Sequence, residues 1–268
     1  MIEFLQQQLS SENNDEKKGN RLREALQLLC LKILHDKGYL TKIAFVGGTV
    51  LRVIYDLRRF SEDLDFSVVE KSGYEFSEMI STVEREFGLS GLEIKAKNRI
   101  NKTVQGSMLK FPSLLKKMGL SPLESQNLSI ELEVDSNPPQ GWHIETSLVT
   151  KTYVLNIMHP DLPSLYATKL HACFFRKYLK GRDFYDLVWY LGKKIKPNYL
   201  LLNRAIEQTQ GKSAGLNEST IKDFLISRVK KIDFDAAKKD VERFLEDKTE
   251  LKLLDKSLVL KSITGVFG

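Results

Sequence analysis

The sequence holds few cysteines, no long apolar run and no leader-like N-terminus. Its two cysteines, Cys30 and Cys173, are too few for a disulfide framework or a cysteine-built zinc site, and burial in apolar helical patterns is their simplest role. No segment approaches the roughly 18 consecutive apolar residues of a membrane span. The N-terminus also lacks the basic-then-apolar layout of a signal peptide. These absences predict a cytoplasmic protein that does not contact a membrane.

The composition that is present indicates a globular protein with unevenly distributed charge. Of 268 residues, 42% are hydrophobic and 28% are charged, which is enough apolar material for a large core in one large or two small domains. The net charge is +6, with 19 basic and 21 acidic side chains in residues 1–150 against 22 and 14 in residues 151–268. A basic second half suits an anionic partner such as a nucleotide or nucleic acid, although an ordinary solvated surface has the same composition.

The first part of the chain predicts helices mixed with strands. Apolar residues at spacings of three and four predict a helix over residues 20–37, which Gly38 would end. A β-branched and aromatic run predicts a strand over residues 42–46, followed by a glycine turn and a helix. The next predicted elements are a strand at 64–69, a helix at 74–87, a hairpin of strands within 92–100 and 104–111, and a strand at 128–134.

The second part of the chain predicts helices only. Three strong candidates, residues 162–179, 183–191 and 235–245, follow Pro160. The predicted fold class is therefore α+β, with an N-terminal mixed-sheet domain over residues 1–158 and an all-helical C-terminal lobe over residues 159–268. A cleft between the two is the default position for a functional site.

Two aspartates that follow a glycine turn are the strongest chemical signal. Gly47 and Gly48 permit a tight turn, and the N–H groups at the start of the helix that follows suit a phosphate chain. Asp63 and Asp65 are separated by one residue, so on a strand both carboxylates point the same way. Two carboxylates about 4 Å apart repel by roughly 4 kcal/mol at an effective dielectric of 20, which favours a bound cation such as Mg²⁺. A strand with a solvated acidic face is the alternative.

Polar residues near this pair support the cation. The predicted strand at 128–134 has an acidic face, Glu131, Glu133 and Asp135, that could supply a third carboxylate. Guanidinium and hydroxyl groups lie just ahead of the aspartates, in Arg58, Arg59 and Ser61. They could pair with phosphates or hold the carboxylates in place, and an ordinary surface loop is the alternative.

Three motifs follow one another along the chain. The first joins Gly47–Thr49 to Arg59–Phe66 (R-x-S-x-D-L-D-F), the second is Ile130–Gly141, and the third is Leu165–Leu187, which ends in RD-x-YDL. Together they resemble the AbiE-type (AbiEii-like) toxin nucleotidyltransferases of the DNA polymerase β-like nucleotidyltransferase superfamily, over most of the chain from about residue 20. The resemblance implies Mg²⁺-dependent transfer of a nucleoside monophosphate (NMP) from an NTP, with pyrophosphate as the leaving group.

The resemblance also implies roles for the matched residues. Asp63, Asp65 and Glu133 would hold two Mg²⁺ ions, although Glu131 and Asp135 remain open as the third ligand. The implied catalytic residues are Asp63, Asp65, Glu133, Lys169 and Asp183. The implied nucleotide-binding residues are Gly48, Thr49, Arg59, Ser61, Lys169 and Arg176.

The predicted helix at 162–179 would supply the positive charge. Its residues Lys169, Cys173, Arg176 and Lys180 follow one stripe, so that Lys169 and Arg176 would point together into the cleft. A solvated helix face is the alternative for Lys169. Gly181 would end this helix, and helix capping is an alternative role for Asp183.

A basic stretch without a single acid suggests where an acceptor would bind. Between residues 94 and 123 it holds Lys95, Lys97, Arg99, Lys102, Lys110, Lys116 and Lys117. These side chains could track the phosphates of a folded RNA or simply form the exposed face of a hairpin. In relatives the acceptor can be the 3′ end of tRNA, and the implied biology is a phage-defence (abortive infection) toxin restrained by a cognate antitoxin. A protein or small-molecule acceptor, or a non-catalytic nucleotide-binding module, are the alternatives.

Overall fold

A computed structural model describes residues 1–10, 12–100 and 102–268. The chain divides into two compact units. The first contains residues 1–56, 60–138 and 146–159, and the second contains residues 57–59, 139–145 and 160–268. The chain therefore contributes a short segment to the second unit just before Asp63 and then returns to the first.

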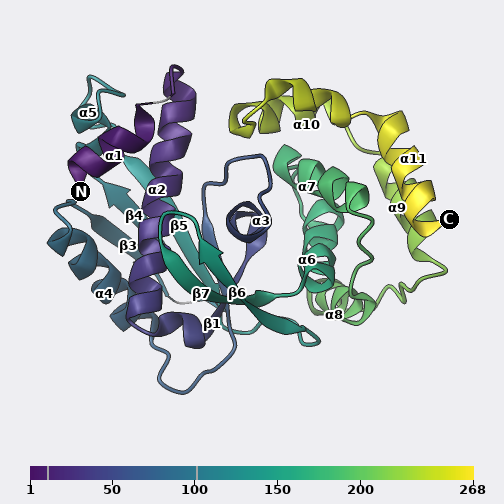
Figure 1. Ribbon diagram of the computed structural model, residues 1–268. Coiled ribbons are helices and arrows are strands. Elements are labelled where there is room, and N and C mark those ends of the chain that lie inside the picture. Colours follow the sequence, from purple (N-terminus) through teal and green to yellow (C-terminus); the bar gives the residue numbers. More distant parts are fainter. Residues whose placement is uncertain (11, 101) are drawn as a thin grey trace. The chain divides into compact units, whose positions relative to one another are not determined.

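The first unit is built on a five-stranded mixed sheet, which with its helices confirms the predicted α+β class (Figure 1). The strand order is β1 (Ile43–Val46), β2 (Leu64–Val68), β5 (Leu128–Asp135), β4 (Val104–Phe111) and β3 (Lys95–Arg99). Only the β2–β5 pair is parallel among the pairings of the described strands. Each of these strands was predicted, and the boundaries differ by a few residues at most.

Helices cover one face of this sheet. The helices of the first unit are α1 (Ile2–Leu9), α2 (Asp15–Asp36), α3 (Gly47–Ile54), α4 (Phe76–Leu89), α5 (Leu114–Lys117) and the 3-10 turn Tyr39–Thr41. Helix α2 packs against α4 and β5, and α4 packs against β3. Strand β5 alternates strictly between buried and half-buried residues, so its apolar face lies in the core and its acidic face points away from it. Asn14 caps α2, and Gly38 follows its end with a φ of 77°.

A second, two-stranded sheet was not predicted. It pairs β6 (Ile144–Thr150) with β7 (Val154–Pro160). Six of the seven residues of β6 are exposed or half-buried, with Val149 alone buried, so the alternation that signals a strand is absent from the sequence.

The second unit is helical. It holds α6 (Leu162–Phe175), α7 (Gly181–Gly192), α8 (Tyr199–Gln210), α9 (Ile221–Val229), α10 (Phe234–Val241), α11 (Lys256–Phe267) and the 3-10 turns Glu242–Phe244 and Lys248–Leu253. Asp161, Asn198, Asp233 and Asp255 cap four of these helices by accepting backbone N–H groups of the first turn. The rings of Tyr166 and Tyr190 stack in the core, with centroids 4.4 Å apart.

The predicted helix over residues 162–179 is too long. Helix α6 ends at Phe175, and Arg176 has an extended backbone with a ψ of 148°. Gly181, which was predicted to end this helix, instead begins α7, where its N–H donates to the Asp240 carboxylate at 2.6 Å. A side chain at Gly181 would overlap the carbonyl of Ala237, so contacts with α10 fix this helix start. The prediction that one helix face carries the residues from Lys169 to Lys180 is therefore wrong.

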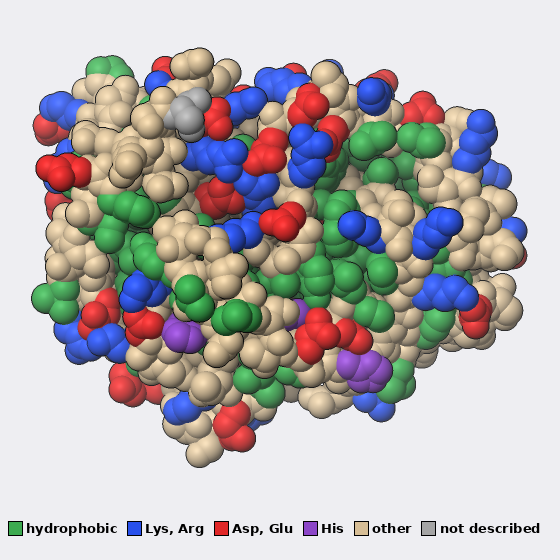
Figure 2. Space-filling view, viewed as in Figure 1, with side chains coloured by type: hydrophobic (Ala, Val, Ile, Leu, Met, Phe, Trp, Pro, Cys, Tyr) green, Lys and Arg blue, Asp and Glu red, His purple; other side chains and the backbone are tan. Residues whose placement is uncertain are grey.

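Lysine and arginine side chains alternate with aspartate and glutamate over the face drawn in Figure 2. The net charge alone therefore does not mark a binding surface on that face. Among the helices of the described residues, none is long and apolar enough to span a membrane.

Candidate active site

The sheet of the first unit places two of the predicted carboxylates side by side. Asp65 of β2 and Glu133 of β5 are register partners in the parallel pair. Neighbouring strands lie about 4.8 Å apart and partners share a face, so the two carboxylates leave the same side of the sheet. Both side chains are half-buried. Asp63 precedes Asp65 by two residues, a spacing that on an extended chain gives the same side.

The glycine turn lies directly against Asp65. Gly47 is the first residue of α3 and has a φ of 76°, a conformation that favours glycine. A Cβ atom at this position would coincide with the Asp65 carboxylate, so only glycine lets the carboxylate approach the helix start. Gly48, the second residue of α3, is half-buried, and no side chain caps this helix. The first N–H groups of α3 therefore lie beside a carboxylate, as a phosphate chain bridged by a cation requires.

Two buried polar residues hold the backbone that leads to Asp63. The Thr49 hydroxyl donates to the Asp63 carbonyl, and Thr49 is 1% exposed. The Gln27 side-chain amide donates to the carbonyls of Ser61 and Asp63 at 3.2 and 3.4 Å. Thr49 and Ser61 were predicted to bind the nucleotide, yet both are buried here and Thr49 supports the backbone. Gln27 was not predicted, since its only signal is an amide within an apolar helix pattern.

The three candidates for the third carboxylate have different surroundings. Arg99 Nη2 donates to Glu133 at 2.5 Å and to Glu131 at 3.1 Å. Asp135 accepts the Asn137 N–H at 2.9 Å, and burial, which outweighs that bond, raises its carboxyl pKa. The register gives Glu133 alone of the three a place beside Asp65, so the geometry favours Glu133.

These residues fit a hard divalent cation by their chemistry. Mg²⁺ prefers a few carboxylate oxygens together with water and phosphate oxygens, and Asp65 and Glu133 present such oxygens from adjacent strands. Carboxylates at this separation repel each other by a few kcal/mol at an effective dielectric of 20, a cost that a cation removes. Within the described residues, no group of three His, Cys, Asp or Glu side chains already forms a metal site.

A second polar cluster lies in the helical unit. Lys169 Nζ contacts Asp183 at 2.7 Å and Asp186 at 2.9 Å. Arg59 pairs with both oxygens of Asp186 at 2.6 Å, and Arg176 contacts Asp183 at 2.8 Å. Lys169 is 9% exposed, so the alternative of a solvated helix face is wrong. The cluster has three cations and two anions, which leaves a surplus positive charge.

The protonation states of this cluster follow from burial opposed by pairing. Burial alone would raise the pKa of Asp183, but the charges of Lys169 and Arg176 outweigh it, and the net effect lowers that pKa. Burial would likewise lower the pKa of Lys169, but Asp183 and Asp186 raise it above its ordinary value. Lys169 and Asp183 are therefore both charged at neutral pH.

Replacing Asp183 by asparagine should destabilise the chain by an amount that does not change between pH 5 and 9. A carboxyl group whose pKa is lowered by folding stabilises the folded chain at any pH above its pKa in the unfolded chain, which is near 3.9. That stability is lost as the pH falls through the pKa of the folded chain. We expect a cost of about 2–3 kcal/mol for the lost charge-assisted hydrogen bonds, shrinking below about pH 4. Urea unfolding of both chains at several pH values measures it. A difference that changes around pH 6 to 7 would contradict this assignment.

Arg59 has surroundings that differ from the sequence prediction, whereas Asp183 contacts Lys169 as its predicted role requires. Arg59 was predicted to bind the nucleotide, but its guanidinium is 2% exposed and is held by Asp186. Asp183 lies in the first turn of α7 and contacts Lys169, and no side-chain cap of α7 is formed. Cys173 Sγ donates to the Asp183 carbonyl at 3.3 Å, and burial raises its thiol pKa well above the ordinary value.

Comparison with known proteins identifies the family. The model of the nucleotidyl transferase AbiEii toxin of type IV toxin–antitoxin systems matches residues 30–257. The chain belongs to this family. It is therefore a nucleotidyltransferase, and membership in the AbiEii family implies NMP transfer within a type IV toxin–antitoxin system. The predicted resemblance is confirmed.

A solved structure shares the fold of this AbiEii family member. A crystal structure of an H. pylori protein assigned as a nucleotidyltransferase is 19% identical, with a TM-score of 0.51, and the match covers 91% of this chain and 95% of that chain. The crystal structure of JHP933 from Helicobacter pylori is 20% identical, with a TM-score of 0.47, covering 91% and 92%. No curated protein matches the chain significantly.

Proposed function

We propose that this chain is a Mg²⁺-dependent enzyme that transfers NMP from an NTP to the 3′-terminal hydroxyl of tRNA. The observation that carries the proposal is the juxtaposition of Asp65 with Glu133 and with the glycine turn at Gly47. Carboxylates beside helix N–H groups are the combination that a metal-bound triphosphate needs. The basic stretch at 94–123, whose seven basic side chains are all exposed, supports an RNA acceptor.

The chain's own residues would act mainly by positioning. Asp63, Asp65 and Glu133 would hold Mg²⁺, which when bound supplies charge neutralisation and a more acidic acceptor hydroxyl. The N–H groups of Gly47 and Gly48 would bind phosphate oxygens. The acceptor oxygen forms a bond to the α-phosphorus, and the bond between the α-phosphorus and the oxygen that bridges it to the β-phosphorus breaks. Pyrophosphate leaves with that oxygen, and the hydroxyl proton passes to solvent.

The buried cluster of the helical unit would contribute positive charge. Lys169 and Arg176 would neutralise developing phosphate charge, while Asp183 would hold both cations in position. Arg59 would act as a positioning residue, because its pair with Asp186 anchors the segment that leads to Asp63. A cognate antitoxin would restrain the activity, as a toxin–antitoxin family implies.

Incubation with labelled NTPs tests this function. We expect wild-type protein with Mg²⁺, total tRNA and one of the four α-labelled NTPs to produce labelled RNA, and Asp63→Ala or EDTA to abolish the label. Label on protein or on a small molecule would replace the RNA acceptor by that class. Absence of label on any acceptor with every NTP would contradict the catalytic proposal.

Growth on expression separates a catalytic toxin from a binding module. Growth arrest that Asp65→Asn removes supports catalysis. Growth arrest that persists in this variant would indicate a non-catalytic nucleotide-binding module instead.

A further inference from the structure

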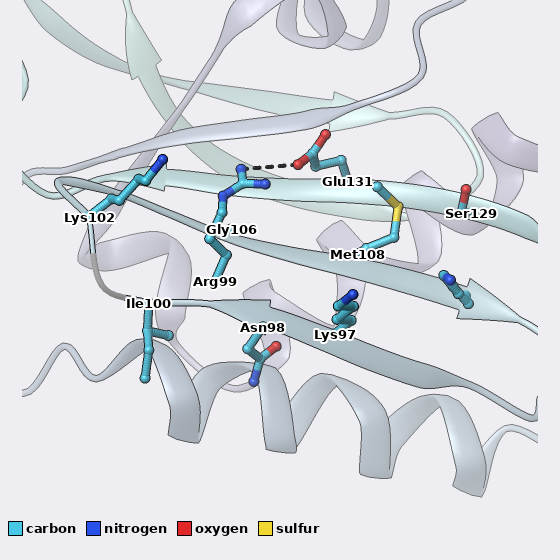
Figure 3. A pocket seen from close by; sticks show the side chains of 10 residues that line it. Lys97, Asn98, Arg99, Ile100, Lys102, Gly106, Met108, Ser129 and Glu131 are labelled. Carbon is cyan, nitrogen blue, oxygen red and sulfur yellow. Dashed lines mark hydrogen bonds and ion pairs between the residues drawn. The ribbon is translucent and has the colours of Figure 1, made fainter.

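A groove runs over the open face of the sheet in the first unit. It has a volume of about 790 Å³. Its lining comes from β3, β4, β5 and the loop between β3 and β4 (Figure 3). Lys97, Arg99 and Lys102 contribute to it, whereas Asn98 points to the opposite side, where it accepts a hydrogen bond from the buried Ser107. The groove therefore belongs to the face that is not covered by α2 and α4.

The lysines of this groove have no anionic partner in the described part of the chain. Lys97, Lys102 and Lys110 line it, are exposed, and form no ion pair with any described residue. Other cations of the same stretch differ, since Lys95 lies 3.7 Å from Glu93 and Lys116 lies 2.5 Å from Glu124. Lys117 also forms no ion pair with a described residue, so three of these four unpaired cations lie where the surface is hollowed, as an anionic ligand would require.

Strand register connects this groove to the candidate metal site. Arg99, Gly106, Glu133 and Asp65 are successive register partners across β3, β4, β5 and β2, so they form one row on one face. Asp65 is therefore two strand spacings, about 10 Å, from the strand that carries Lys110. An anionic chain lying in the groove would end beside the carboxylates.

Arg99 marks the junction. Its guanidinium crosses β4 to reach Glu131 and Glu133, and a Cβ atom at Gly106 would lie 2.8 Å from Arg99 Nη2 (Figure 3). Glycine at position 106 therefore leaves the crossing open. Along the groove, Arg99 lies between Lys102 and Lys97, next to Glu131 (Figure 3).

We infer that this groove binds the phosphate backbone of the acceptor RNA and guides its 3′ end to the Asp65–Glu133 pair. The inference rests on the proposed function for the identity of the acceptor. An RNA backbone fits better than a compact anion because the unpaired lysines are spread over two strands and a loop. Sequence-independent contacts of this kind position the strand without selecting its bases.

Equilibrium binding without NTP tests the inference separately from catalysis. The probe is fluorescein-labelled tRNA, and anisotropy is measured for the full chain over a range of salt concentrations. The groove variant is Lys97→Glu/Lys110→Glu, and the control is Lys71→Glu/Lys212→Glu, which changes the same charge at exposed lysines outside the groove. Arg99 is left in place because it contacts Glu133.

We expect the groove variant to bind tRNA at least about tenfold more weakly and to lower the slope of log K against log salt by about 1 per lysine. The control variant should retain both values. Unchanged affinity and slope in the groove variant would overturn the inference, even if wild type labels tRNA. If wild type labels no acceptor but the groove variant loses tRNA binding, the proposed function fails and the groove assignment stands. Fluorescein-labelled poly-glutamate serves as a second probe in the same titration. If the groove variant loses binding to poly-glutamate but keeps its affinity for tRNA, the surface docks an acidic protein and the RNA assignment is wrong.

Discussion

Replacing Asp65 by asparagine should lower NMP transfer by about 10³-fold or more while the fold is retained. A factor of 10³ corresponds to about 4 kcal/mol of transition-state stabilisation, the size expected when a metal ligand that neutralises phosphate charge is lost. Asparagine keeps the shape of the side chain, so its fit against Gly47 is preserved. Initial rates of label transfer from the active NTP to tRNA, at saturating Mg²⁺, measure the effect.

A matched change at an exposed aspartate controls for charge. Asp15→Asn removes one negative charge from the same unit, at a side chain that is 77% exposed at the start of α2, and it should leave the rate unchanged. Circular dichroism and the unfolding midpoint of both variants should match wild type. A rate for Asp65→Asn within a factor of ten of wild type would remove Asp65 from the metal site.

The sequence predicts well which face of the sheet these carboxylates take, because strand periodicity determines it. Asp63, Asp65 and Glu133 alternate with apolar residues such as Leu64 and Leu132, and that alternation sets which face each side chain takes. The parallel pairing of β2 with β5 is not encoded in either strand's own pattern, yet it is what places Glu133 beside Asp65. The sequence therefore predicts the face, and the tertiary structure decides the neighbour.

The polar cluster of the helical unit is less predictable, because long-range contacts determine it. Arg176 follows the helix pattern in sequence but lies beyond the end of α6, since contacts with α10 set the start of α7 five residues later. Arg59 was predicted as a phosphate ligand from its position near the aspartates, but its partner Asp186 lies 127 residues away in the chain. No local pattern reports such a pair.

Replacing Asp186 by alanine should destabilise the helical unit by about 3–5 kcal/mol. Asp186 is fully buried, pairs with Arg59 and is one of two carboxylates on Lys169, so its removal leaves buried positive charge without compensation. Arg59→Met should cost less, because Asp186 keeps its contact with Lys169 at 2.9 Å. Urea unfolding followed by circular dichroism measures both changes.

A double variant separates the effect of the Arg59–Asp186 ion pair from the effect of the volume that the two side chains fill. In Arg59→Met/Asp186→Leu both charges are replaced by apolar groups while Lys169 retains Asp183, so we expect a smaller loss than for Asp186→Ala alone. Glu218→Ala, which removes the exposed partner of Lys196, should leave the unfolding midpoint unchanged. If Asp186→Ala is no more destabilising than Glu218→Ala, Arg59 does not anchor the segment that leads to Asp63. Nucleotidyl transfer by the folded double variant then decides whether that anchor also positions the carboxylates, since a purely structural pair would leave its rate at the wild-type value.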